Sequence, residues 1–257
     1  MFEFDRRVAI VIGINDYQNG IPRLETARYD AECLADVLQS NYGYEVERLL
    51  DQEATSNNIW AKLELVRQRT KPNERVQLLF YFAGHGTPPS DEAGEAGYLV
   101  PQNGCSRELT SFLSMQEIHK TLVELKCHHL LIILDCCFAG AFRFTTRHIG
   151  VIREELSKER YDRYTQYRAA QVIASAAHDQ KAIDIVLDNR GTSKDVEFAN
   201  HSPFAAALLR ALKYEPADYT KDGITTATEL FLYVSEEVLA QTQNSRNPQV
   251  PRFCNAT

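Results

Sequence analysis

Short apolar runs alternate with amphipathic segments along most of the chain, and this alternation restricts the fold more than any other feature. The apolar runs are typical of strands buried on both faces of a parallel sheet. The amphipathic segments repeat their apolar residues every three or four positions, as helices that cover a sheet do. The expected strands are 7–14, 44–50, 76–82, 129–135 and 170–176, and the expected helices are 25–40, 55–69, 114–125, 203–212 and 226–242.

Strands and helices in this order predict an α/β fold in which a mostly parallel sheet has helices on both faces. The chain has 257 residues, of which 44% are hydrophobic, so it can bury a large core as one domain, 1–257. We expect a larger part, 1–142, and a smaller part, 169–257, to share the sheet. The segment between them, 143–168, includes a stretch in which eight of eleven residues are charged. It is either a solvated amphipathic helix or an exposed linker.

The charge balance limits the partners of the protein. Lys and Arg total 28 against 35 Asp and Glu, a net charge of −7, which argues against nucleic acid and favours a cationic ligand. No apolar run is long enough to span a bilayer, and acids stand near the N-terminus where a secretory signal carries bases. We therefore expect a cytoplasmic protein without a membrane partner. The six cysteines are then free thiols, and because none forms a CxxC pair no metal site is assigned.

Two of the apolar runs end in reactive side chains. Run 76–82 is followed by a Gly-His-Gly sequence centred on His85, and run 129–134 is followed by an acidic residue and two cysteines, Cys136 and Cys137. In an open α/β sheet, ligands bind beyond the carboxyl ends of the strands. If these two strands are neighbours, about 4.8 Å apart, the imidazole and a thiol lie at the same edge of the sheet.

A histidine beside a cysteine predicts nucleophilic catalysis. The imidazole converts the thiol into the thiolate that attacks a carbonyl carbon. The backbone N–H groups of Gly86 and Cys137 are in a position to stabilise the oxyanion that forms. A histidine roughly 50 residues upstream of the cysteine is also the order found in caspases. Taken singly, His85 and the cysteines would have ordinary structural roles.

The two motifs resemble those of a known family. Segments 81–86 (YFAGHG) and 135–140 (DCCFAG) are similar to the catalytic motifs of the caspase-like cysteine peptidases, closest to metacaspases and prokaryotic orthocaspases. Segments 7–17, 24–38 and 171–176 resemble the family's first strand, its first helix and the strand that opens its small subunit. The resemblance implies a caspase-hemoglobinase-like three-layer α/β/α sandwich, with six mostly parallel strands, and a cysteine endopeptidase activity.

The family motif assigns the catalytic roles. Its nucleophile is the third residue of the second motif, which is Cys137 here, and its base is His85. Cys136 stands where serine is usual and is either a packed small residue or a redox-active neighbour. No third catalytic residue is evident, as expected of a dyad. The family's usual polar residues beside the site are replaced by Ala83, Phe138 and Ala139.

Two acidic residues match the positions that line the S1 pocket of metacaspases, namely Asp30 and Asp135. Two carboxylates in a narrow pocket favour a cationic side chain and exclude an acidic one. Arginine is preferred over lysine because its planar guanidinium can bridge both carboxylates. We therefore expect protein or peptide substrates with Arg, then Lys, at P1. The simpler interpretations are an exposed helix residue for Asp30 and a cap on the turn after the strand for Asp135.

The charged segment 143–168 suggests self-cleavage. It lies where caspase-like proteins join their large and small subunits, and it is rich in the residues that the S1 pocket should accept. Cleavage there would be a proteolytic switch. These basic residues are Arg143, Arg147, Arg153, Lys158, Arg160, Arg163 and Arg168.

Calcium is implied by the family resemblance only. The loop after His85 contains Asp91, Glu92 and Glu95, but their spacing is not that of an EF-hand, and a solvated acidic loop is the simpler interpretation. The resemblance also allows further domains in a longer natural chain.

The amino-acid sequence is also compatible with two other functions. The first is a catalytically weak or inactive caspase-like scaffold that binds a basic peptide segment of a partner. The second is a thiol hydrolase acting on small amides without any peptide preference.

Overall fold

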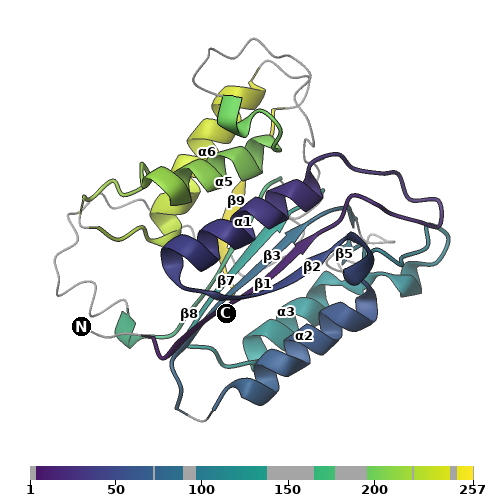
Figure 1. Ribbon diagram of the computed structural model, residues 1–257, viewed down its shortest axis with the longest axis horizontal. Coiled ribbons are helices and arrows are strands. Elements are labelled where there is room, and N and C mark those ends of the chain that lie inside the picture. The colour runs from purple at the N-terminus through teal and green to yellow at the C-terminus, as the bar shows by residue number, and fades with distance from the viewer. Residues whose placement is uncertain are drawn as a thin grey trace.

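The main strands lie in one six-stranded sheet in the order β2-β1-β3-β7-β8-β9 (Figure 1). Its strands are β1 (Arg6–Gly13), β2 (Glu45–Leu50), β3 (Val76–Ala83), β7 (His129–Asp135), β8 (Ala169–Ala174) and β9 (Arg252–Asn255). Neighbouring strands are parallel, except that β9 is antiparallel to β8. This computed structural model describes residues 4–71, 73–88, 97–137, 165–176, 196–221, 223–243 and 248–256.

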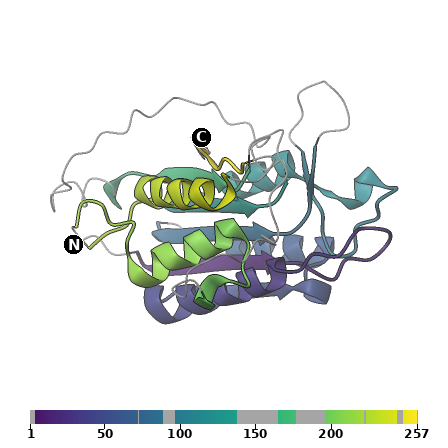
Figure 2. The same cartoon turned by 90° about the horizontal axis from the view of Figure 1, so that it is seen from above.

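Helices cover both faces of the sheet and complete three layers. On one face lie α1 (Ala27–Tyr42), α5 (Pro203–Tyr214) and α6 (Ala227–Thr242), and on the other lie α2 (Ser56–Arg69) and α3 (Met115–Glu124). Helices α5 and α6 run side by side, as the view from above also shows (Figure 2). The expected α/β/α sandwich with a mostly parallel six-stranded sheet is therefore confirmed. Among the described residues, no helix combines the length and apolar character that a membrane span requires.

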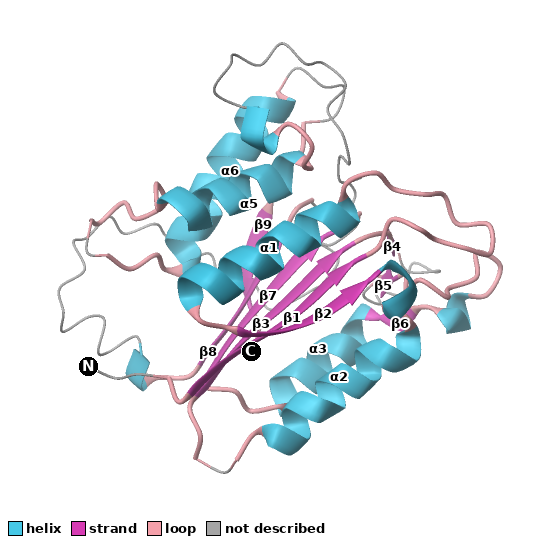
Figure 3. Ribbon diagram, viewed as in Figure 1, coloured by secondary structure: helices cyan, strands magenta, loops and turns pink. Residues whose placement is uncertain are grey.

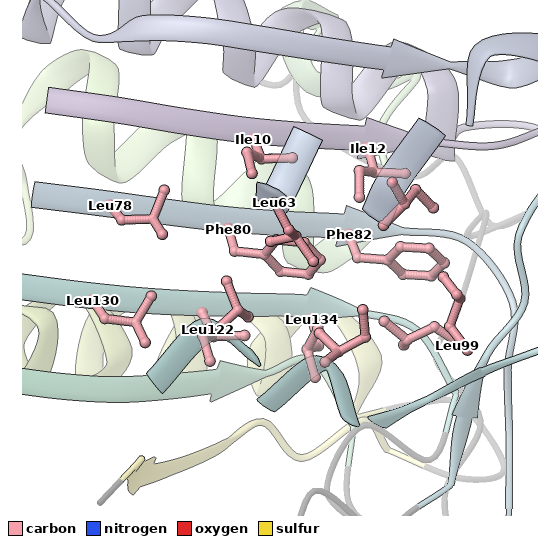
Figure 4. Close-up of a cluster of buried hydrophobic side chains, with 14 of the residues drawn as sticks. Ile10, Ile12, Leu63, Leu78, Phe80, Phe82, Leu99, Leu122, Leu130 and Leu134 are labelled. Atoms are coloured by element: carbon pink, nitrogen blue, oxygen red, sulfur yellow. The ribbon is translucent and has the colours of Figure 1, made fainter. Parts of the chain in front are cut away.

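Alternate residues of each strand supply the two halves of the core. Ile10, Phe80 and Leu134 point toward α2 and α3, where Leu63 and Leu122 meet them (Figure 4). The intervening residues pack against α1, α5 and α6. Fully burying one such large apolar side chain contributes about 1.5–3 kcal/mol, so the continuous apolar runs are what hold the three layers together.

Helix α1 lies close to β1 because of one glycine. A Cβ atom on Gly13 would be 2.4 Å from the Cβ of Ala31 and 2.6 Å from the carbonyl oxygen of Ala27. A larger residue at this position would push the helix off the sheet. The contact brings the first turns of α1, including Asp30, over the carboxyl end of β1.

The sequence periodicity located the main elements to within two residues at each end, but missed the smaller ones. Strand β9 was not expected, because four residues at a sheet edge show no clear alternation. A separate three-stranded sheet was also missed, formed by β4 (Gly86–Thr87), β5 (Tyr98–Leu99) and β6 (Leu113–Ser114) beyond the carboxyl end of β3 (Figure 3). The remaining short elements are the 3-10 turns η1 (Asp51–Glu53), η2 (Leu109–Ser111) and η4 (Val196–Phe198).

Candidate active site

The register of two neighbouring strands brings the histidine and cysteine motifs to one edge of the sheet. Strands β3 and β7 are parallel neighbours, and Ala83 pairs with Asp135. His85 and Cys137 each lie two residues beyond this pair. The backbone N–H of Gly84 continues the pairing by donating to the carbonyl oxygen of Asp135 at 3.2 Å. The expectation that the two strands are neighbours is thus correct.

The residue after the histidine touches the cysteine motif directly. A Cβ atom on Gly86 would be 2.2 Å from the carbonyl oxygen of Cys137 and 3.2 Å from the Sγ of Cys136. Any side chain at this position would therefore displace the cysteines. Gly86 also begins β4 and pairs with Leu99, which holds the histidine loop on the small sheet.

The imidazole of His85 is oriented by a backbone carbonyl. Its Nε2 lies 2.8 Å from the carbonyl oxygen of Pro22. A carbonyl oxygen can only accept, so Nε2 carries the hydrogen in this contact and Nδ1 is the nitrogen that can accept a proton. This arrangement selects the tautomer that a base needs. Sequence patterns did not identify Pro22, because a backbone carbonyl leaves no mark in the residue type.

Tyr17 supports the same histidine from the other side. Its hydroxyl accepts a hydrogen bond from the backbone N–H of His85 at 2.8 Å and donates to the carbonyl oxygen of Val100 at 3.3 Å. The two rings also pack together, with their centroids 4.8 Å apart. Burial raises the pKa of Tyr17, so the phenol stays protonated and keeps both hydrogen bonds.

The loop that carries Tyr17 and Pro22 is anchored by a buried carboxylate. Asp51 Oδ1 accepts hydrogen bonds from the backbone N–H groups of Asn15 at 2.8 Å and Asp16 at 3.0 Å. Its other oxygen forms a salt bridge with Arg28 at 3.1 Å. Asp51 therefore ties the start of the loop that continues to Pro22 to the end of β2 and to the first turn of α1.

The two adjacent cysteines have different surroundings. Cys136 is buried in the core layer on the α2 and α3 side of the sheet, whereas Cys137 is partly exposed. Burial raises the pKa of Cys136 well above its ordinary value, and the charges of Cys137 and Asp135 act in the same direction. Cys136 is thus a protonated, packed thiol in this structure.

The two acidic residues of the expected pocket lie together. Both are buried, with 1% of Asp30 and 7% of Asp135 exposed. They share one partner, because the Ser202 backbone N–H donates to Asp30 Oδ2 at 3.3 Å and the Ser202 hydroxyl donates to Asp135 Oδ2 at 2.8 Å. The interpretation of Asp30 as an exposed helix residue is therefore wrong.

His201 completes this cluster and was not found in the sequence. Its Nδ1 lies 2.5 Å from Asp30 Oδ1, and the ring of Tyr29 stacks on the imidazole at 4.7 Å. Burial lowers the pKa of His201, but hydrogen bonds to Asp30 and Cys33 outweigh this effect and raise it to about 9. The imidazole therefore carries a positive charge at neutral pH. Burial also raises the pKa of Asp30 above its usual value, although the His201 contact opposes that shift.

Two buried hydroxyl groups near the carboxylates have no hydrogen-bond partner among the described residues. They belong to Tyr81 on β3 and to Ser175, which follows β8. Burial raises the pKa of Tyr81, and the negative charges of Asp135 and Asp30 raise it further. Buried polar atoms are normally paired, so these two hydroxyls are exceptions to that rule within the described part of the chain.

Several expected features fall outside the described residues. They are Phe138 and Ala139, the acidic loop residues Asp91, Glu92 and Glu95, and most of the segment 143–168. Within the described part of the chain, no group of three or more His, Cys, Asp or Glu side chains is arranged to hold a metal ion.

Comparison with known proteins gives one family. The family model described as the caspase domain matches residues 6–257. A crystal structure of a Geobacter sulfurreducens protein is similar, with 16% identity and a TM-score of 0.61 over 97% of this chain and 93% of that one. Caspase-1 from Spodoptera frugiperda is 17% identical, with a TM-score of 0.62 over 96% of this chain and 85% of that one. At these identities the two structures show the fold alone. A search of curated proteins gave no match.

Proposed function

Because the chain belongs to the caspase-domain family of cysteine peptidases, we propose that it is an endopeptidase that cleaves after arginine and, less efficiently, after lysine. The proposed dyad is His85 and Cys137. The observation that carries this proposal is the strand register, which aligns Ala83 with Asp135 and so brings both motifs to one sheet edge.

The hydrogen bonding of His85 supports its role as the base. The Cys137 sulfur attacks the scissile carbonyl carbon and forms a C–S bond, while its proton passes to Nδ1 of His85. The imidazolium keeps its Nε2 hydrogen bond to Pro22, which stabilises the new charge. The backbone N–H groups of Gly86 and Cys137 stabilise the oxyanion.

Collapse of this intermediate breaks the peptide C–N bond, and the leaving amine takes the proton from His85. Water then attacks the thioester as His85 accepts one of its protons. The second collapse breaks the C–S bond, releases the carboxylic acid and returns the proton to the thiol.

The buried acids support a cationic P1 side chain. Asp30 and Asp135 both contact Ser202. The hydroxyl of Tyr81, which has no hydrogen-bond partner among the described residues, is close enough for their negative charges to raise its pKa. A guanidinium offers five N–H donors in a plane and can meet several oxygen atoms at once, whereas an ammonium is a point charge. This difference is the reason to expect arginine before lysine.

A peptide panel tests the proposal. The full chain is assayed with fluorogenic peptides that differ only at P1, carrying Arg, Lys, Asp or Leu, in parallel with Cys137→Ala and with the matched Cys136→Ser. We expect cleavage after Arg and Lys, its loss in Cys137→Ala, and its retention in Cys136→Ser. Preferential cleavage after Asp would contradict the assigned pocket. If the Arg peptide binds but is not cleaved, a non-catalytic scaffold is favoured. The same conclusion follows if an electrophilic Arg peptide binds but does not label Cys137.

We also propose that the enzyme cleaves itself within 143–168. This segment precedes β8, contains seven basic residues and follows the nucleophile motif in the chain. The intact protein should yield two fragments with a new end after one of these residues, and Cys137→Ala should remain one chain. Full peptidase activity in an uncut protein would show that cleavage is not a switch.

A further inference from the structure

A segment of the protein itself already forms hydrogen bonds with the two carboxylates of the proposed S1 pocket. His201 and Ser202 precede the first turn of α5, and between them they contact three of the four carboxylate oxygens of Asp30 and Asp135. Ser202 is neutral and also accepts a hydrogen bond from the backbone N–H of Ala205 as the helix N-cap. His201 supplies the positive charge.

We infer that His201 is a specificity-determining residue of this pocket: its imidazole holds the place on Asp30 that a substrate guanidinium takes, and the substrate has to displace it. The inference rests on the proposed function, because it names the occupant of the same S1 site. It goes further in assigning an internal competitor to that site.

The surroundings of His201 favour its charged form. Asp30, Tyr29 and Cys33 face it from α1, and the negative charge of Glu197 in η4 also acts on it. The Asp30 and His201 side chains are 1% and 3% exposed, so little water separates them. Asp135 lies outside this pair, and its charge acts on the buried hydroxyl of Tyr81.

Displacement of His201 does not require the fold to change. The residue lies outside α5, one position before the N-cap, so its side chain can rotate while the first turn of the helix keeps its hydrogen bonds. A guanidinium can then bind Asp30 through two parallel N–H bonds, where the imidazole makes one. The two cations compete for one carboxylate, and an acidic or neutral P1 side chain cannot replace the imidazole without leaving the Asp30 carboxylate without a cationic partner.

Competition of this kind links ligand binding to proton release. On Asp30 the imidazole has a pKa of about 9, and once displaced into water it has one of about 6.5. Near pH 7.75 it is almost fully protonated before displacement and almost fully neutral afterwards. Binding of a guanidinium should therefore release most of one proton, and the release should fall toward zero below about pH 6.

Calorimetry with agmatine tests the inference without any need for catalysis. Agmatine presents a guanidinium on a short chain and has no bond to cleave. Titration of the full chain at pH 7.75 in buffers of different ionisation enthalpy counts the protons released on binding. We expect most of one proton for the wild-type protein and a smaller count for His201→Asn, which keeps an N–H donor but does not titrate. Any release that remains in the variant comes from other groups such as Asp30, whose pKa burial raises. Agmatine should also bind His201→Asn on the order of tenfold more tightly.

The control is His129→Asn, which alters a half-buried histidine at the opposite end of β7 and should release as many protons as the wild-type. Equal proton release by the wild-type and His201→Asn, weaker agmatine binding by the variant, or no binding to the wild-type would overturn the inference.

If His201→Asn fails to fold, His201→Gln replaces it. Release of almost no protons by the wild-type protein would contradict the inference without any variant. If agmatine binds with proton release but no peptide is cleaved, the proposed endopeptidase activity is contradicted and the role of His201 in the pocket is retained.

If peptides are cleaved after Arg but no proton is released on binding, the endopeptidase activity is retained and the role of His201 is contradicted.

Discussion

The Nε2 atom of His85 lies 2.8 Å from the carbonyl oxygen of Pro22. This contact gives the proposed dyad a third member that belongs to the backbone. It orients the ring and selects the tautomer in which Nδ1 can accept a proton. The position of the Pro22 carbonyl depends on the conformation of the loop that contains it. Asp51 and Tyr17 support this arrangement, and Gly86 allows the cysteine motif to approach it closely.

Asp51→Ala should lower activity by releasing the Pro22 loop. It removes the acceptor of two backbone N–H groups, those of Asn15 and Asp16, which costs about 1–3 kcal/mol for each buried donor left unpaired. We expect kcat to fall on the order of tenfold, because the base loses its orientation. Chemical unfolding and peptidase kinetics measure the two effects.

The control for this prediction is Asp36→Ala, which removes an exposed salt bridge to Arg48. Exposed pairs contribute about 0–1 kcal/mol, so this variant should keep both stability and kcat. If Asp51→Ala lost stability but retained the wild-type kcat, the loop anchor would have no catalytic importance.

Tyr17→Phe should reduce kcat while leaving the fold intact. The variant loses the hydroxyl that accepts from the His85 N–H, but keeps the ring that packs on the imidazole. We expect a stability loss of about 1–2 kcal/mol and a kcat reduction on the order of tenfold. The matched variant Tyr42→Phe removes a hydroxyl bonded to the Leu212 carbonyl in another part of the molecule. It should show the stability loss alone, and equal kcat values for the two variants would refute the prediction.

Gly86→Ala should abolish most activity. Its methyl group would lie 2.2 Å from the Cys137 carbonyl oxygen, so Cys137, the proposed nucleophile, has to move. A displacement of about 1 Å can cost on the order of 100-fold in rate. Gly43→Ala is the useful contrast, because Gly43 has φ +66 and nothing within 4 Å of its Cβ position. That variant should lose about 1 kcal/mol of stability and keep its kcat. An active Gly86→Ala protein would show that the two motifs are not in contact.

Stability should depend on pH through His201. Its pKa is raised to about 9 in the fold, against about 6.5 in the unfolded chain. A raised pKa means that the folded protein holds the proton more tightly, so this contribution is fully present below about pH 6.5 and is lost as pH rises to about 9. The difference in unfolding free energy between pH 6 and pH 9.5 should be larger for the wild-type than for His201→Asn by about 2–3 kcal/mol. Parallel urea titrations at the two pH values measure it, and identical differences would rule out a charged His201.

Local sequence patterns determined the layers and the main strands because periodicity is a property of neighbouring side chains. Continuous apolar runs predict strands buried on both faces, and β1, β3 and β7 are such strands. The patterns missed β9, since four residues at an antiparallel edge carry too little periodicity to be recognised. They also missed the small sheet, whose two-residue strands depend on the loops around them.

The chemistry of the candidate site divides in the same way. The sequence by itself determined the reactive residue types and their positions at strand ends, and so it identified His85, Cys137, Asp30 and Asp135 as candidates. It could not identify Pro22, because a backbone carbonyl is common to all residues and only the path of the loop selects it.

Only the tertiary structure decided what surrounds the two acids. Asp30 and His201 are 171 positions apart and meet because α5 packs against α1 on one face of the sheet. No local pattern records that contact, since it depends on the packing of whole helices. The same packing buries both carboxylates, and burial strengthens the electrostatic interaction of Asp30 with the cationic imidazole of His201.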